Sequence, residues 1–232
     1  MYLARGVLNP ASRDVQRDLS DAVHMHRTLM RVFPDHMGEN PRKTLRVLYR
    51  VDEDRRRAEL VLFVQSEERP DFSRLPSGYF ASPADDLDLA LAGDAMNPRL
   101  RSVSEERAAI AVGDRFVFRL RANTTKKIGT KSLPDGTKQN GRRVPVRGDE
   151  ERLKWLTHRE AKGGFRLGGV RIAELQPIGG RAREHQLTFG GCVFEGVLVV
   201  TAAAEFRLTL AEGIGPAKAF GFGLLSVQRL TA

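Results

Sequence analysis

The histidines of the chain are its most direct candidates for acid–base chemistry. His24 and His26 are two residues apart, which on a helix separates their side chains by about 200° and prevents chelation of one ion. The remaining histidines (His36, His158 and His185) form no metal-ligand pattern with the lone cysteine, Cys192. We therefore expect neither a metal nor a cofactor.

His26 lies in an apolar arc at helical spacing, whereas Arg27 and Arg31 fall on the polar face. A buried core histidine is one interpretation. The other is a general acid or base near a helix start, where the dipole favours the neutral ring. With cations nearby, such a histidine fits RNA cleavage by the 2′-hydroxyl, which requires a base, an acid and stabilisation of a phosphorane.

The glycine-rich segment 213–223 contains Lys218 and is neither a Walker A loop nor a dinucleotide fingerprint. Ala217 precedes the lysine where Walker A has glycine, and Ala219 replaces the required Ser or Thr. A backbone with many unhindered N–H groups suits close approach of a sugar-phosphate chain. A helix C-cap followed by strand bulges is the alternative.

Positive charge is concentrated in one part of the 232 residues. The net charge is +9, but residues 1–120 hold 19 basic and 19 acidic side chains. Residues 121–147 carry +7, from Arg121, Lys126, Lys127, Lys131, Lys138, Arg142, Arg143 and Arg147 against Asp135. We interpret this block as a phosphate-binding segment, with a solvated surface loop as the alternative.

Composition excludes several classes of protein. A single cysteine allows no internal disulfide and favours a reducing, cytoplasmic setting. The first ten residues lack the apolar stretch of a signal peptide, and no run of about 18 apolar residues predicts a membrane span.

The strands and helices expected to position these residues follow the same order, βαββαβ, in each half of the chain. In the first half we expect a strand over 2–8, helical pattern over 12–33 with Ser20 or Asp21 as cap, strands over 45–51 and 59–65, a helix over 84–92 and a last strand within 100–112. In the second half we expect a strand over 116–121, a helix over 149–160, strands over 168–178 and 185–200 with Gly190-Gly191 as a turn, a helix over 201–212 capped by Thr201 and Gly213, and a strand over 220–230.

These patterns predict an α+β fold of two tandem ferredoxin-like (βαββαβ) domains joined by a linker. The domains would span 1–95, with the catalytic helix, and 115–232, with the basic segment and the glycine-rich loop. Residues 96–114 would supply the linker and an edge strand.

Segments along nearly the whole chain resemble the CasE family, the CRISPR RNA-processing endoribonucleases of the type I-E Cascade complex. They are Met1-Tyr2-Leu3 through Leu8-Asn9-Pro10, His26-Arg27-Thr28-Leu29-Met30, 60–66 with Pro70-Asp71-Phe72-Ser73, Phe118 to Asn123, Arg143-Val144-Pro145, Glu151 to Leu156, and Gly213 to Leu225. Glycine loops of the last kind mark the repeat-associated RNA-binding superfamily, and Asn9-Pro10 with the His26 segment narrows the resemblance to CasE.

The resemblance implies binding of a CRISPR repeat stem-loop and metal-independent cleavage at the 3′ base of the stem. It also implies a 2′,3′-cyclic phosphate and 5′-hydroxyl as products, after which the enzyme keeps the mature crRNA as a Cascade subunit. The family's catalytic histidine maps onto His26, and Arg27 and Arg31 would hold the backbone. Lys218, Arg159 and the basic block would be further RNA contacts.

One position departs from the family pattern. CasE proteins commonly carry a tyrosine three residues before the histidine, where this chain has Val23. This departure predicts either a slower enzyme or one in which Lys162 or His24 serves as the catalytic partner of His26. Two alternatives stay open: a non-catalytic subunit that holds the RNA hairpin, and a DNA-binding protein that does not distinguish ribose from deoxyribose.

Overall fold

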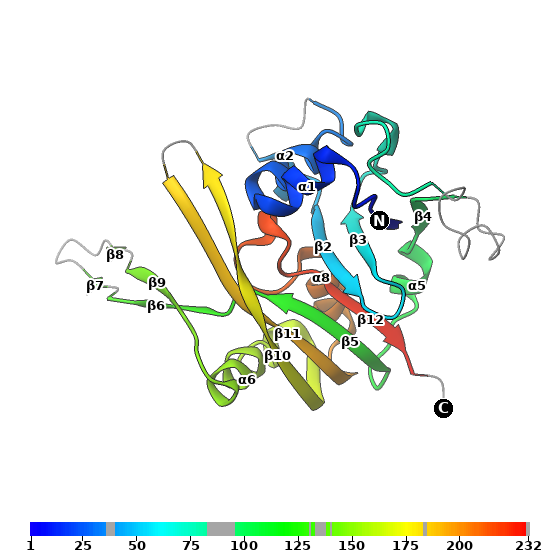
Figure 1. Ribbon diagram of the computed structural model, residues 1–232. Helices are drawn as coiled ribbons and strands as arrows, with labels where there is room; N and C mark the ends of the chain where they lie inside the picture. The colour runs from blue at the N-terminus through cyan, green and yellow to red at the C-terminus, as the bar shows by residue number, and fades with distance from the viewer. Residues whose placement is uncertain are drawn as a thin grey trace.

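The computed structural model describes residues 1–35, 40–82, 96–129, 131–132, 138–139, 141–182 and 185–230. Two four-stranded antiparallel sheets dominate it, and each is drawn from one half of the chain (Figure 1). The first sheet has the order β2-β3-β1-β4 and the second the order β10-β11-β5-β12. Both are the strand order of a ferredoxin-like domain, so the predicted fold class is confirmed.

The first half contributes the following elements: β1 (Tyr2–Val7), α1 (Arg13–Ser20), α2 (Ala22–Met30), α3 (Pro41–Thr44), β2 (Leu48–Asp54), β3 (Glu59–Ser66), η1 (Phe72–Arg74), β4 (Arg99–Ser102) and α5 (Ser104–Ala108). The second half contributes β5 (Arg115–Ala122), β6 (Thr125–Ile128), β7 (Lys131–Ser132), β8 (Lys138–Gln139), β9 (Arg142–Pro145), α6 (Asp149–Thr157), α7 (Glu160–Gly163), β10 (Phe165–Ala182), β11 (His185–Val200), α8 (Ala203–Glu212), η2 (Lys218–Phe220) and β12 (Leu225–Arg229).

The helical pattern over 12–33 is interrupted at Asp21. This residue has extended backbone angles (φ −140°, ψ 111°) and separates α1 from α2. Its carboxylate accepts from the backbone N–H groups of Val23 (2.7 Å) and His24 (3.2 Å) and so caps α2, as expected of one of the two proposed caps. The break fixes where α2 begins and therefore which way His26 points.

The predicted turn at Gly190-Gly191 is wrong, because both glycines lie inside β11. A Cβ on Gly191 would lie 2.1 Å from the carbonyl oxygen of Ala122 on β5. The glycine is therefore present for close approach of two strands. The long hairpin instead pairs Ala182 with His185 at its tip.

Other boundaries also differ from the expectation. Residues 45–47 precede β2 rather than belong to it. The stretch 100–112 gives the short strand β4 and then α5. Thr201 does not cap α8, whose N-cap is Ala202, whereas Gly213 is the C-cap with φ 75°. The helix expected over 84–92 falls outside the described residues.

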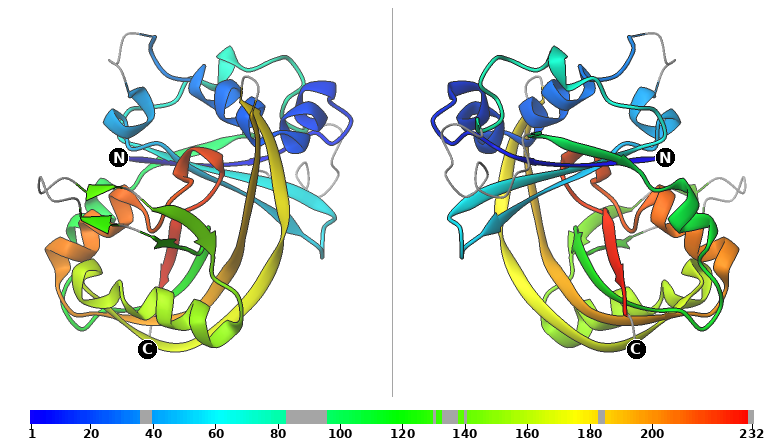
Figure 2. Two further views of the ribbon diagram at one scale, coloured as in Figure 1. Left: turned by 90° about the vertical axis from the view of Figure 1, so that its left-hand side faces the viewer. Right: turned by 90° about the vertical axis from the view of Figure 1, so that its right-hand side faces the viewer.

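Each half has its own hydrophobic core. One buried cluster gathers apolar side chains of α1, α2 and the first sheet, among them Leu29, Phe33 and Tyr49. The other gathers side chains of the second sheet, α6 and α8, among them Trp155, Phe194 and Phe206. Figure 2 shows β10 and β11 rising from the second core to α1 and α2, so this hairpin bridges the halves.

The helices that the structure describes include none long and apolar enough to cross a membrane.

Candidate active site

His26 lies on α2, at the boundary between the two domains. Its half-buried imidazole meets the ring of Phe220 edge-on, with 6.2 Å between the ring centroids. Phe220 belongs to η2 in the glycine-rich loop and stacks on Phe189 of β11 at 4.4 Å. Figure 1 shows this loop, in orange-red, beside α2. The predicted histidine and the predicted loop are thus brought together.

The surroundings of His26 favour its neutral form. Burial is the main cause that lowers its pKa, and the positive charges of Arg42 and Arg27 lower it further. The half-buried Arg42, on α3, also lowers the pKa of Lys218, after burial as the larger cause. Arg42 therefore acts electrostatically on both His26 and the lysine of the loop. A neutral imidazole at neutral pH can accept a proton.

A cavity of about 290 Å³ beside the loop collects further predicted residues. Lys162 of α7, its N-cap Arg159, and Lys218 line it together with His158. The carboxylates of α8 that also line it belong to Glu205 and Glu212. The cavity thus combines three residues that the sequence analysis assigned separately. Their cationic groups suit a phosphate.

Trp155 contacts both Arg159, which lines this cavity, and the glycine-rich loop. Its indole N–H donates to the carbonyl of Thr125 at 3.0 Å, and the guanidinium of Arg159 lies 3.3 Å above its ring. A Cβ on Gly215 would lie 2.9 Å from Trp155 Cη2, so the loop packs closely on the ring. Burial, and then the charge of Arg143, lower the pKa of Arg159 to about 10.

The basic block forms a β-ribbon, β6 with β9, that extends from the second domain (Figure 1). Lys126, Lys127, Arg142 and Arg143 are exposed on it, and Lys127 pairs in register with Arg143. The two basic residues directly opposite each other concentrate positive potential on one strand pair. Lys131 and Lys138 lie on the short strands β7 and β8, where the structure describes the backbone alone.

Three predicted residues lie outside this arrangement. Arg121 points into the domain junction, donates to the carbonyl of Val51 at 3.2 Å and lies over the ring of Phe222. Arg31 is the exposed C-cap of α2. His24 lies about 200° around α2 from His26, and its buried Nδ1 has no hydrogen-bond partner among the described residues.

Val23 occupies the position at which the family resemblance predicts a tyrosine. It is 7% exposed and packs on β10, where a Cβ on Gly180 would lie 3.1 Å from its Cγ2. A hydrogen bond reinforces the contact: the backbone N–H of Arg181 donates to the side-chain carboxylate of Asp21 at 3.0 Å. The hairpin therefore covers this face of α2.

Arg42 and Phe220 were missed as site residues by the sequence analysis. The Asn40-Pro41 pair is typical of a helix start and could have predicted α3, which carries Arg42. No local signal predicts that Phe220 meets His26, since the contact depends on how the domains dock. Among the described residues, no group of three or more His, Cys, Asp or Glu is arranged to hold a metal ion.

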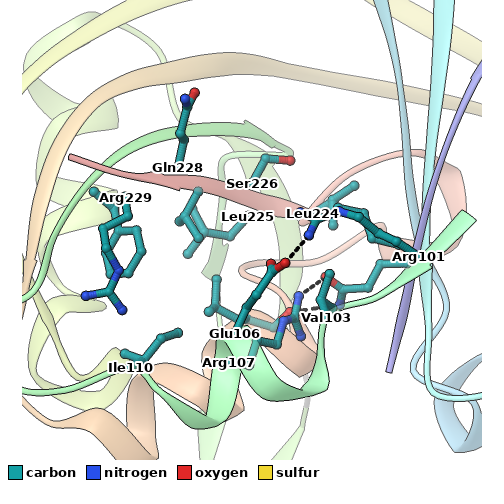
Figure 3. A pocket seen from close by; sticks show the side chains of 15 residues that line it. Arg101, Val103, Glu106, Arg107, Ile110, Leu224, Leu225, Ser226, Gln228 and Arg229 are labelled. Carbon is teal, nitrogen blue, oxygen red and sulfur yellow. Dashed lines mark hydrogen bonds and ion pairs between the residues drawn. The ribbon is translucent and has the colours of Figure 1, made fainter. Parts of the chain in front are cut away.

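A second cavity, of about 380 Å³, lies between β4, α5 and β12 (Figure 3). Arg101 and Glu106 form an ion pair there, and Arg107 donates to Gln65. Among the described residues that line this cavity there is no histidine or lysine, and its one carboxylate, Glu106, is paired with Arg101.

The structure is thus a pair of ferredoxin-like domains that meet at a histidine and a glycine-rich loop, beside a cavity lined by clustered cations. The chain belongs to the CRISPR-associated protein family, whose model, described as CRISPR associated protein, matches residues 1–229.

Comparison with individual proteins supports the same family membership. The CRISPR-associated endoribonuclease Cse3 of Thermus thermophilus is 32% identical, over 98% of this chain and 99% of its own. The Cascade subunit CasE of Escherichia coli is 33% identical over 52% of this chain and 61% of its own. The structure of CRISPR endoribonuclease Cse3 bound to 19 nt RNA superposes with a TM-score of 0.74 at 33% identity, covering 98% of this chain and 100% of that one.

Proposed function

We propose that this protein is a metal-independent endoribonuclease that binds the stem-loop of CRISPR repeat RNA. It cuts precursor CRISPR RNA at the 3′ base of the stem and leaves a 2′,3′-cyclic phosphate and a 5′-hydroxyl. The observation that carries the proposal is the half-buried His26, whose pKa is lowered by burial and by Arg42 and Arg27. The relative named as an endoribonuclease matches nearly the whole chain and supports the same activity.

The reaction uses the RNA's own nucleophile. His26 takes the proton of the 2′-hydroxyl, and the 2′-oxygen attacks the adjacent phosphorus. The bond from phosphorus to the 5′-oxygen breaks, and that oxygen takes up a proton. We assign Lys162 as the proton donor, because it lines the cavity that also contains Lys218. Arg27 and Lys218 stabilise the charge of the phosphorane.

The remaining cations bind the RNA backbone. The exposed ribbon residues Lys126, Lys127, Arg142 and Arg143 grip the stem, and Arg159 contacts a phosphate within the cavity. Arg31, at the end of α2, continues the positive face that begins with Arg27. The structure of Cse3 bound to 19 nt RNA supports RNA as the ligand.

After cleavage the protein retains the mature crRNA and joins other Cascade subunits. The support is the similarity to CasE, named as a Cascade subunit. We further propose a cytoplasmic location, in agreement with the single buried cysteine.

The test is cleavage of a repeat hairpin by the pure protein in EDTA. Wild type is expected to give the cyclic phosphate product, and His26→Ala to slow cleavage by about 10²- to 10⁴-fold. His185→Ala, an exposed histidine on the hairpin, is the control and keeps wild-type activity. Full cleavage by His26→Ala would refute the assignment of the base.

A non-catalytic RNA-hairpin-binding subunit is the second candidate. It is favoured by Val23, because this side chain packs against Gly180 and offers no proton to transfer. Tight hairpin binding by wild type without any cut product would establish this function in place of the nuclease.

A further inference from the structure

The residues that flank the glycine-rich segment 213–223 are bound to the first domain on both sides. At the start, the Gln65 side-chain N–H donates to the carbonyl of Leu210 at 2.8 Å. At the end, the buried Arg50 donates to the carbonyl of Leu224 at 3.3 Å and to the hydroxyl of Ser226 at 3.1 Å. Gln65 and Arg50 lie on β3 and β2, so the first sheet holds a segment of the second domain.

Gln65 is itself fixed, because its side-chain oxygen accepts from Arg107 of α5. Figure 3 shows Arg107 in the wall of the cavity that lies beside this contact. The anchor at the start of the segment is therefore held from two elements.

A third contact from the first sheet reaches the middle of the segment. The hydroxyl of Tyr49, on β2, donates to the carbonyl of Ala219 at 3.2 Å. Its ring also packs under Gly221, where a Cβ would lie 3.2 Å from Tyr49 Cε2. Gly221 has φ 81°, so the close approach and the backbone angle both require glycine there. Tyr49 is 4% exposed and thus rigidly packed.

The held stretch carries the ring that contacts His26 and a lysine of the neighbouring cavity. Ala219 lies between Lys218, which lines the cavity of about 290 Å³, and Phe220, whose ring contacts the imidazole of His26. The stretch is one three-residue 3₁₀ turn, preceded by Ala217 at φ 59°. A non-glycine residue in the left-handed region persists only where its surroundings hold it. The Tyr49 hydrogen bond supplies such a hold from the first domain, beside the stacking of Phe189 on Phe220 from β11.

We propose that Tyr49 is a positioning residue for RNA cleavage. Its hydrogen bond to the carbonyl of Ala219 fixes the positions of Lys218 and Phe220 relative to His26. The inference rests on the proposed function of His26. In this inference, a buried side chain of the first domain determines the conformation of a loop in the second domain. Displacement of a catalytic group by about 1 Å is enough to cost up to 10²-fold in rate.

The chain offers a matched control in Tyr79. This tyrosine is buried in the same core as Tyr49, and its hydroxyl donates to Asp18 at 2.9 Å, within the first domain. Tyr79→Phe and Tyr49→Phe each remove one buried hydroxyl; that of Tyr79 bonds to Asp18 and also lies 3.4 Å from Met25 Sδ, whereas that of Tyr49 bonds to the loop. Of the two variants, only Tyr49→Phe removes a hydrogen bond to the loop.

The experiment compares the two variants by three measurements. For Tyr49→Phe we expect a single-turnover cleavage rate lowered about tenfold, hairpin affinity within about twofold of wild type, and faster hydrogen exchange at the amide of Phe220, which bonds to the carbonyl of Ala217. The acid limb of its pH–rate profile should move to higher pH, because a loosened Phe220 admits water to His26. Tyr79→Phe should change melting temperature without these effects.

The outcomes separate this inference from the proposed function. Unchanged Phe220 exchange in Tyr49→Phe, or equal slowing of cleavage by Tyr79→Phe, would overturn the role of Tyr49. Hydrogen exchange needs no RNA, so it tests the hold on the loop even if wild type cuts nothing. If His26→Ala cleaved RNA at the wild-type rate while Tyr49→Phe loosened the loop, the assignment of His26 as the base would be refuted and the hold of Tyr49 on the loop would stand.

Discussion

The imidazole of His26 and the ring of Phe220 meet edge-on at 6.2 Å, with 68° between their planes. One residue comes from α2 near the start of the chain and the other from the last turn before β12. The site is therefore complete only when the two domains are docked. The contact also removes water from one side of the imidazole, which contributes to the burial that lowers its pKa.

Arg42→Gln should move the acid limb of the pH–rate profile to higher pH. A general base works as the neutral ring, so the rate rises through the pKa of His26 and levels off at neutral pH. Burial and then Arg42 lower that pKa, so loss of the charge moves it back toward its ordinary value of 6.5. Single-turnover rates between about pH 5 and 8 measure the shift. Lys43→Gln, exposed on the same helix, is the control, and an identical profile for Arg42→Gln would contradict the prediction.

Replacing Lys126, Lys127, Arg142 and Arg143 by Ala should weaken hairpin binding and flatten its salt dependence. Each lost phosphate contact is expected to reduce the slope of log affinity against log salt by up to about one. Binding is measured by titration at several salt concentrations. Arg55, Arg56 and Arg57, in the exposed turn between β2 and β3, are the control for general loss of charge. An unchanged slope would mean that the ribbon makes no phosphate contacts.

Asp21→Ala should destabilise the fold by about 1 kcal/mol, the usual cost of a lost N-cap. For a chain of this size that corresponds to about 2–4 °C in melting temperature. Asp21→Asn, which keeps a capping oxygen, is expected to recover most of the loss. Equal melting temperatures for Asp21→Ala and wild type would show that the cap contributes nothing.

The same carboxylate gives a pH dependence of known sign. Burial raises the pKa of Asp21, but bonds from the N–H groups of Val23, Arg181 and His24 outweigh it and lower the pKa overall. A carboxylate whose pKa is lowered by folding stabilises the protein fully at pH values above its pKa in the unfolded state. This stabilisation is lost as the pH falls through its pKa in the folded state. The stability difference between wild type and Asp21→Asn should therefore shrink below about pH 4.

Gly191→Ala should disrupt the second sheet, whereas Gly190→Ala should be tolerated. A Cβ at 191 would lie 2.1 Å from the Ala122 carbonyl, while at 190 nothing lies within 4 Å. Overpacking of this kind costs about 1–3 kcal/mol. Chemical denaturation of both variants measures the difference, and equal stability would show that β5 and β11 can move apart at little cost.

The same pair of glycines shows where sequence patterns are insufficient. Two adjacent glycines are a local turn signal, but Gly191 is set by the approach of a strand about seventy residues earlier, which no local pattern contains. The strand over 116–121 was predicted correctly as β5, because alternating Phe116, Phe118 and Leu120 face one core. Local sequence patterns predict an element correctly where one of its faces packs on one core. They fail where the conformation depends on contact between elements that are distant in the sequence.

The candidate site divides in the same way. His26, Lys162 and Lys218 were available from their types, spacing and family resemblance, and the structure places both lysines at one cavity. Arg42 was missed because its influence is electrostatic and reaches across two domains. Arg121 was included with the basic block, but its side chain lies at the domain junction.

The β6–β9 ribbon, in the second half of the chain, carries much of the net charge, whereas residues 1–120 are neutral. The molecule therefore has an electric dipole. In the field of a polyanion a dipole experiences a torque, so the protein turns its ribbon toward the polyanion before the two surfaces touch. Encounters become productive more often than random orientation allows, and added salt slows association more than it speeds release.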